Sequence, residues 1–196
     1  HRYVKTLLSQ LQMPCRLGAA IAHIRREHNG AVLTMRDGTE ERYDAVVLAA
    51  HADEALRLLA DPSEAERRLL GAWSYQENRT LLHTDESVMP SNRHAWASWN
   101  YVQRRGGSDD DPVAVSYHMN RLQNLSAQRS YFVTLNNGHS VRREHVLREI
   151  LYTHPVYTFD AMATQDALPQ LNGVRRTFFC GSYFGYGFHE DAVRSA

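Results

Sequence analysis

The alternation of apolar and polar residues predicts a helix and then three short strands at the start of the chain. Apolar side chains recur at helical spacing over residues 2–12, and Pro14 ends that pattern. Strands are expected over residues 20–27, 31–36 and 39–43. Asn29-Gly30 is a strong signal for a two-residue hairpin loop, and Asp37-Gly38 turns the chain again. The expected product is a β-meander.

A different kind of strand is expected over residues 45–50, where apolar residues follow one another without a break. This pattern is typical of a strand buried on both faces of a parallel sheet. Helices are expected over 53–59 and 63–70, the second with a capping box of Ser63 and Glu66. Nothing earlier in the sequence predicts a parallel neighbour for the strand, so we expect the chain to be a segment of a larger protein. The absence of a starting methionine agrees with this expectation.

Residues 73–155 have the pattern of a separate unit. Strands are expected over residues 79–84, 94–102, 113–119 and 131–135. Apolar residues at helical spacing predict a helix over 140–152, and the Gly- and Asp-rich segment 104–111 predicts a solvated loop. Beyond this unit, a short helix is expected over 164–171 and a buried strand over 177–180.

The charge balance narrows the classes of partner. The 22 basic and 22 acidic residues cancel, which argues against nucleic acid or an anionic membrane surface as the main partner. No apolar run approaches the roughly eighteen residues of a membrane span. Two distant cysteines, Cys15 and Cys180, predict a reduced, cytoplasmic protein. The 11 histidines lack the spacing of ligands, so no metal site is expected.

The C-terminal stretch combines a strand, a glycine-punctuated loop and the start of a helix. Gly181, Gly185 and Gly187 remove Cβ atoms where a backbone approaches a ligand or takes a positive φ. Free N–H groups at a helix start suit an electron-rich acceptor, but Glu190 and Asp191 already satisfy the helix dipole. We therefore expect a neutral heterocycle carbonyl that gains charge during reaction, rather than a phosphate. A helix start with acidic capping and no ligand stays an alternative.

Several stretches carry a resemblance to a known family. Cys180-Gly-Ser182 and Gly187-Phe-His-Glu-Asp-Ala-Val-Arg-Ser195 resemble the C-terminal flavin motif of flavin amine oxidases and phytoene desaturases. That motif reads Ala/Cys-Gly-acid, a loop, then Gly-x-x-Glu-Gly-Ala-x-x-Ser-Gly. Residues 18–50 resemble the segment in which this family returns to its FAD-binding domain. The chain also resembles a bacterial subgroup of amine-oxidase-like, predicted NAD/FAD-binding proteins, which share three stretches with it: Ser98-Trp-Asn-Tyr101, His154-Pro-Val-Tyr157 and Gly187-Phe-His-Glu-Asp191.

The resemblance implies an α/β fold with FAD as the cofactor. A partial Rossmann-like FAD-binding domain, residues 1–71 and 159–196, is interrupted by a mixed β-sheet plus helix substrate domain, residues 72–158. The implied cofactor-binding residues are Ile21, Ala49, Ala50, Gly181, Ser182, Gly187, Phe188, His189 and Ala192.

On the adenosine side, the resemblance places the Ile21 backbone near adenine and Ala49 with Ala50 beside the adenosine–pyrophosphate region. Gly181 and Ser182 approach the pyrophosphate and ribityl chain, although Ser182 stands where the family has an acidic residue. The family's Gly-x-Gly-x-x-Gly phosphate loop is nowhere in this sequence. We therefore expect the chain alone to bind FAD weakly or not at all.

On the ring side, the resemblance places Phe188 beside the isoalloxazine and the N–H of His189 at its C2 carbonyl, and Ala192 lets the helix pack closely. The substrate pocket is expected to include Trp99, Tyr157, Tyr186 and Phe188. The aromatic residues of the middle unit are expected to divide between core and pocket, according to the face of the sheet on which they lie. No side chain is a convincing general base, so the catalytic residues stay unassigned.

The chemistry implied by the resemblance is hydride transfer from a substrate C–H bond to flavin N5. Amine oxidases of the family place a lysine in the substrate domain, but Lys5 is the only lysine of this chain. A desaturase- or dehydrogenase-like reaction on a small apolar substrate is therefore favoured over amine oxidation. A flavin amine oxidase is the first alternative. The second is a non-catalytic module that packs through exposed sheet edges against a partner or its own copy as a homo-oligomer.

Overall fold

The computed structural model describes residues 2–11, 13–102, 114–136 and 140–196. The chain divides into two compact units, residues 1–74 with 155–196 and residues 75–154. The architecture is mixed α/β. Among the described residues, no helix has the length and apolar character needed to cross a bilayer.

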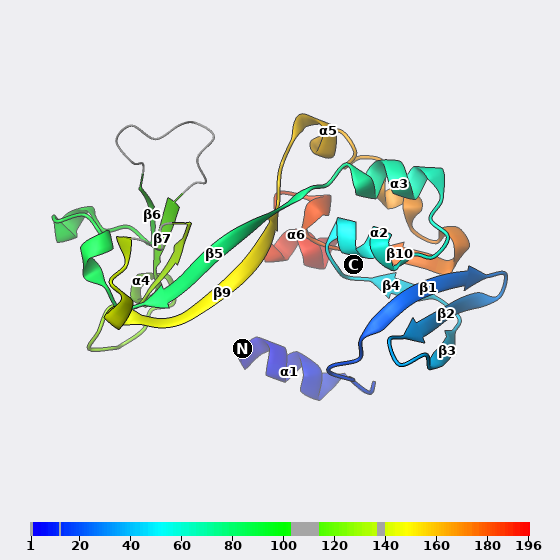
Figure 1. Ribbon diagram of the computed structural model, residues 1–196, viewed down its shortest axis with the longest axis horizontal. Helices are drawn as coiled ribbons and strands as arrows, with labels where there is room; N and C mark the ends of the chain where they lie inside the picture. Colours follow the sequence, from blue (N-terminus) through cyan, green and yellow to red (C-terminus); the bar gives the residue numbers. More distant parts are fainter. Residues whose placement is uncertain (1, 12, 103–113, 137–139) are drawn as a thin grey trace. The chain divides into compact units, whose positions relative to one another are not determined.

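The first unit begins with a helix and a meander. Helix α1 (Arg2–Gln10) precedes the antiparallel sheet of β1 (Ile21–Glu27), β2 (Gly30–Met35) and β3 (Glu40–Tyr43), drawn in blue in Figure 1. The three predicted strands are confirmed, but the first hairpin loop is His28-Asn29, because Glu27 pairs with Gly30. Gly30 is needed inside the strand instead, since a Cβ there would lie 2.3 Å from the carbonyl oxygen of Tyr43.

The predicted apolar strand finds its parallel neighbour near the other end of the chain. Strand β4 (Val46–Leu48) pairs with β10 (Thr177–Phe179) in parallel register. One face of this pair is buried, whereas Val47 on the other face is 62% exposed and Phe178 is 39% exposed. The expectation of a strand covered on both faces is therefore wrong for the described chain.

Two helices follow β4 and contact each other. Helix α2 (Ala52–Leu58) leads to α3 (Glu64–Gly71), and the predicted capping box is confirmed. The Ser63 hydroxyl accepts a hydrogen bond from Glu66 N at 3.2 Å, and the Glu66 carboxylate accepts one from Ser63 N at 2.6 Å. Glu66 also pairs with Arg26 of β1, which therefore ties the meander to α3.

The chain returns to the first unit through short elements. Helix α5 (Phe159–Met162), the 3₁₀ turns η5 (Leu168–Leu171) and η6 (Val174–Arg176), β10, the turn η7 (Ser182–Phe184) and helix α6 (His189–Arg194) follow in order. The single helix expected over 164–171 is replaced by turns, with Pro169 at the start of η5. Leu168 and Phe179 join Leu48 and Leu70 in the core of this unit.

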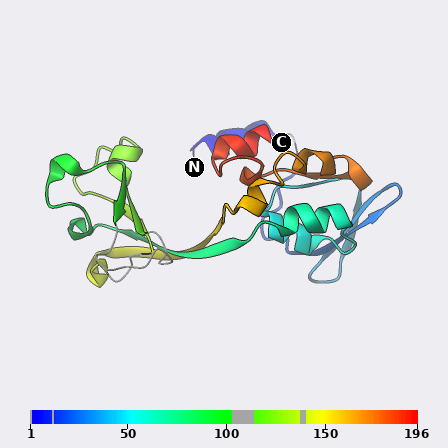
Figure 2. The same ribbon diagram turned by 90° about the horizontal axis from the view of Figure 1, so that it is seen from above.

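The second unit is a five-stranded sheet in the order β6-β7-β8-β5-β9. Its strands are β5 (Tyr75–His83), β6 (Trp99–Val102), β7 (Ala114–His118), β8 (Phe132–Leu135) and β9 (Val146–Pro155). Strands β5 and β9 lie side by side in both views (Figures 1 and 2). The short helix α4 (Met119–Leu122) and the turns η1 (Glu86–Val88), η2 (Arg93–Ala95) and η4 (Arg143–His145) complete the unit.

Two sequence predictions in this unit are wrong. The helix expected over 140–152 is replaced by β9, because this segment pairs with β5 in the sheet. The strand expected from residue 94 begins at Trp99, since the Asn92 side chain accepts from His94 N and caps a 3₁₀ turn. The loop expected over 104–111 lies outside the described residues.

The buried face of this sheet holds a row of rings. His83, Phe132 and His118 lie opposite one another on β5, β8 and β7, and Trp96 packs edge-on against the last two. Trp99, by contrast, pairs with Tyr117 at 5.4 Å between ring centroids and is 57% exposed. Trp96 is therefore a core residue, whereas Trp99 lies on the open face of the sheet.

Candidate functional site

The carboxyl ends of β4 and β10 meet at one edge, because the two strands run parallel and in register. Ala49 and Ala50 follow β4, and Gly181 follows β10 after Cys180. A Cβ on Gly181 would lie 3.5 Å from the carbonyl oxygen of Ala50. In open α/β sheets, ligands bind outside the carboxyl ends of the strands, so this edge is a candidate site.

The spaces left by the three loop glycines are filled by side chains of this chain. A Cβ on Gly181 would meet the Tyr183 ring at 2.6 Å, and one on Gly185 would meet the Asp191 carboxylate at 2.5 Å. A Cβ on Gly187, whose φ is +91°, would meet the Tyr157 hydroxyl at 2.8 Å. The positive φ expected in this loop is confirmed at one position, but the close approach serves internal packing.

Polar side chains fix the loop backbone from several directions. The Asp191 carboxylate accepts hydrogen bonds from Tyr186 N at 3.1 Å and Phe188 N at 2.9 Å. The Gln165 amide donates to the carbonyl of Gly185 at 2.6 Å. The Ser195 hydroxyl accepts from Gly181 N at 2.9 Å. The shape of the loop is therefore fixed by contacts within the chain.

Tyr157 lies beneath the loop. Its ring packs edge-on against Trp73 with the centroids 5.4 Å apart, and its hydroxyl donates to the carbonyl of Ser182 at 3.5 Å. Burial, and then the nearby Asp191 carboxylate, raise the pKa of this hydroxyl above its usual value. Tyr157 consequently supports the loop from within the first unit.

Exchanging Gly187 for alanine is expected to lower the free energy of unfolding by about 1–2 kcal/mol, because an L-residue is strained at positive φ and the new methyl group crowds the Tyr157 hydroxyl. Urea denaturation measures the loss. Gly38→Ala is the matched control, since Gly38 has a φ of +87° with nothing within 4 Å of the added Cβ. Adding Tyr157→Phe to Gly187→Ala removes the crowded hydroxyl, so it should restore the part of the lost stability that is due to crowding. Equal losses in Gly187→Ala and Gly38→Ala would contradict the contact.

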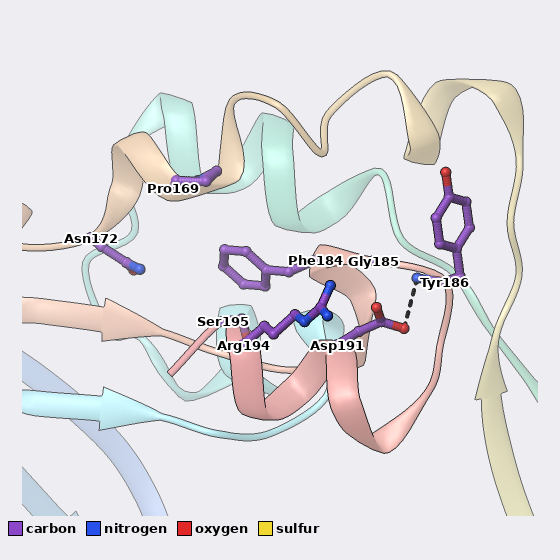
Figure 3. Close-up of a pocket in the computed structure, with 8 residues that line it drawn as sticks. All are labelled: Pro169, Asn172, Phe184, Gly185, Tyr186, Asp191, Arg194 and Ser195. Atoms are coloured by element: carbon purple, nitrogen blue, oxygen red, sulfur yellow. Dashed lines mark hydrogen bonds between the residues drawn. The ribbon is translucent and has the colours of Figure 1, made fainter.

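The start of α6 presents backbone donors. The N–H groups of His189 and Glu190 take part in no hydrogen bond within the described part of the chain, and the Phe188 side chain is 59% exposed. A cavity of about 440 Å³ adjoins this helix (Figure 3). It is lined by Pro169, Asn172, Phe184, Gly185, Tyr186, Asp191, Arg194 and Ser195. Its mixed apolar and polar walls fit a heterocycle with hydrogen-bond acceptors.

The structure gathers most, but not all, of the expected cofactor residues. Ala49, Ala50, Gly181, Ser182, Gly187, Phe188, His189 and Ala192 lie at the strand ends, in the loop or in α6. Ile21 begins β1 in the other sheet, opposite Met35. Of the expected pocket residues, Tyr186 lines the cavity, and Trp99 belongs to the second unit.

Sequence reasoning missed Gln165, named Ser195 only as part of the C-terminal motif, and gave Asp191 as an acidic residue that caps the helix start. Asp191 carried a signal, since an acidic residue in the first helical turn often bonds to the N–H groups before the helix. Gln165 carried none, because its loop partners lie far along the chain. Within the described ranges, no group of three or more histidine, cysteine or acidic side chains is arranged to hold a metal ion. Burial raises the pKa of the Cys180 thiol, which makes it a poor nucleophile.

Comparison with solved structures shows which known proteins have a similar fold. The fatty acid isomerase from P. acnes superposes with a TM-score of 0.62 at 17% identity, over 97% of this chain and 48% of that one. A putrescine oxidase triple mutant gives 0.62 at 11% identity, over 99% and 50%. At these identities the likeness concerns the fold alone. The chain spans about half the length of these structures, and no curated protein matches it.

A family model described as "Flavin containing amine oxidoreductase" matches residues 1–117. This match takes in the meander, the strand β4 that borders the candidate site, and part of the second unit. The superposed structures agree with it in fold over nearly the whole chain. The chain therefore belongs to the flavin-containing amine oxidoreductase family.

Proposed function

We propose that this chain forms part of an FAD-dependent oxidoreductase, with the 181–188 loop and the start of α6 facing the flavin ring. The observation that carries the proposal is the meeting of β4 and β10 at Ala50 and Gly181, beside a helix start whose first N–H groups are free. Members of the family contain a flavin, and we infer FAD as its form because dinucleotides bind at the carboxyl ends of parallel strands.

The residues have distinct proposed roles. Ala49, Ala50, Gly181 and Ser182 border the pyrophosphate and ribityl chain, with the Ile21 backbone towards the adenine. Phe188 would stand beside the ring, and the His189 N–H would donate to the C2 carbonyl, where negative charge develops on reduction. Ala192 keeps α6 close. The flavin, when bound, accepts a hydride at N5 from a substrate C–H bond.

The proposed substrate is a small apolar molecule, and the reaction is desaturation or dehydrogenation. Lys5 is the only lysine of the chain, so the second unit has no ammonium group to serve amine oxidation. Trp99 and Tyr117 put uncharged aromatic surface on the open face of that unit. One similar structure is named for a fatty acid, which is consistent with this class, and another for putrescine, an amine.

The decisive test is the colour of the purified full-length protein. It should be yellow, show the absorbance of oxidised flavin, and release FAD on denaturation. The 196-residue chain alone should take up FAD weakly or not at all, because it lacks the glycine-rich phosphate loop. A full-length protein that is colourless and does not bind added FAD would contradict the proposal. The non-catalytic module, which the exposed Val47 and Phe178 favour, would then be the better explanation.

The proposed preference for desaturation or dehydrogenation over amine oxidation gives a separate prediction. The flavin-loaded full-length protein should release no hydrogen peroxide above background with a panel of primary and secondary amines, because the family's lysine is absent. A coupled peroxidase assay measures this. Peroxide formation with any amine of the panel would overturn the preference and support a flavin amine oxidase.

A further inference from the structure

Asp191 shapes the loop that precedes α6. One carboxylate oxygen accepts from Tyr186 N at 3.1 Å and from Phe188 N at 2.9 Å, as the close-up in Figure 3 shows for Tyr186. Hydrogen bonds to a carboxylate are stronger than those between neutral groups. The backbone before the helix therefore depends on one side chain that lies within the helix.

Gly185 makes room for this carboxylate. Its φ of −143° does not require glycine. A Cβ at this position, however, would lie 2.5 Å from both Cγ and Oδ1 of Asp191. The missing side chain of Gly185 and the carboxylate of Asp191 thus form a matched pair, and alteration of either one should displace the other.

The other side of the loop is held by its carbonyl groups. The Gln165 amide donates to the carbonyl of Gly185 at 2.6 Å and to that of Tyr183 at 3.2 Å. Asp191 binds N–H groups of the loop and Gln165 binds its carbonyls. The exposed Phe188 ring and the N–H groups of His189 and Glu190 have no such partner among the described residues. The proposed function assigns the Phe188 ring and the His189 N–H to the flavin.

We propose that Asp191 is a positioning residue for the cofactor, holding the loop so that Phe188 and the His189 N–H face the flavin ring. This inference rests on the proposed function. Its carboxylate also neutralises the positive end of α6, so it disfavours an anion there and favours the neutral edge of a heterocycle.

Four variants of the full-length protein test the role. Asp191→Ala should speed amide exchange at Tyr186 and Phe188 about tenfold without FAD, and weaken FAD binding about tenfold, because two hydrogen bonds are lost. Asp191→Asn keeps an acceptor oxygen and should stay closer to wild type in both measurements. Gly185→Ala should behave like Asp191→Ala. Asp166→Ala removes an exposed carboxylate of the same unit and should change neither measurement.

The outcomes separate the two proposals. A wild-type protein that binds no FAD overturns the proposed function, whatever the variants do. A wild-type protein that binds FAD, with exchange and FAD affinity unchanged in both Asp191→Ala and Gly185→Ala, overturns the role of Asp191 alone. Loss of FAD affinity in Asp191→Ala, with rescue in Asp191→Asn, supports positioning by the acceptor oxygen. If Asp191→Ala and Asp191→Asn lose FAD affinity equally, while amide exchange in Asp191→Asn stays normal, positioning by the acceptor oxygen is overturned.

Discussion

Replacing Arg26 by methionine is expected to lower the free energy of unfolding of the first unit by about 3–5 kcal/mol. The Arg26 side chain is 0% exposed and its partner Glu66 is 3% exposed, so the substitution leaves a carboxylate buried without its cation. The guanidinium also donates from Nε to the Asp61 carboxylate at 3.0 Å and from Nη2 to the Asp61 carbonyl at 2.7 Å. The variant loses these bonds together.

The pKa of Glu66 shows which force dominates in this cluster. Burial acts to raise it, yet the hydrogen bonds from Arg26 and Ser63 bring it below its usual value. The carboxylate is therefore kept charged by its partners. Removing Arg26 leaves the burial without the strongest of the groups that offset it.

Urea denaturation of the full chain, with amide exchange to assign the loss to β1 and α3, measures the effect. Arg26→Met combined with Glu66→Gln should be less destabilised than Arg26→Met alone, because no buried charge remains and the capping box keeps an acceptor. Arg42→Met is the surface control, since its pair with Glu27 is exposed and should be worth less than about 1 kcal/mol. A loss in Arg26→Met as small as in Arg42→Met would contradict the argument.

This cluster also shows why sequence reasoning succeeded for some elements. The capping box of Ser63 and Glu66 is a local pattern over four residues, and the structure has it. The partner of Glu66 is Arg26 on β1, and no pattern along the sequence links the two positions. Likewise, β4 and β10 were each predictable from apolar composition, whereas their pairing depends on the whole fold.

The sequence predictions that were wrong also depended on contacts between distant parts of the chain. The apolar spacing over residues 140–152 fits a helix and a strand, and the neighbouring β5 decides for the strand. The candidate site was predictable in position, because glycines between a strand and a helix are visible in the sequence. The use of those glycines was not, since Gly185 and Gly187 accommodate side chains of Asp191 and Tyr157 that only the folded chain brings there.

Lowering the pH from 7 to 4 is expected to destabilise the second unit by about 3 kcal/mol through His83 alone. This side chain is fully buried, and burial lowers its pKa to about 4 from an ordinary value of 6.5. Its Nδ1 accepts from Asp85 N at 3.1 Å, and its Nε2 lies 2.8 Å from the Thr134 hydroxyl. A neutral ring with its proton on Nε2 satisfies both contacts, and a protonated ring breaks the first.

The difference in proton binding between the folded and unfolded chain sets the direction in which stability changes with pH. Between pH 6.5 and about 4 the unfolded chain binds a proton at His83 that the folded chain does not, so stability is full above this window and falls as the pH drops through it. His118 acts in the same direction, because burial and then Arg121 lower its pKa, while Glu86 opposes them weakly. Asp85 keeps its charge throughout the window, since Arg142 holds its pKa far below the usual range.

His118→Phe is the informative variant for this acid response. Both ring nitrogens of His118 are buried without a hydrogen-bond partner among the described residues, and the ring stacks on Phe132 at 5.2 Å. Phenylalanine keeps the stacking and removes the unpaired nitrogens, so the variant should retain more of its stability at pH 5 than wild type. Amide exchange in β7 and β8 at pH 7 and pH 5, with the exposed His94→Phe as control, measures the difference. If His118→Phe and His94→Phe lose protection equally between the two pH values, His118 does not contribute to the acid sensitivity.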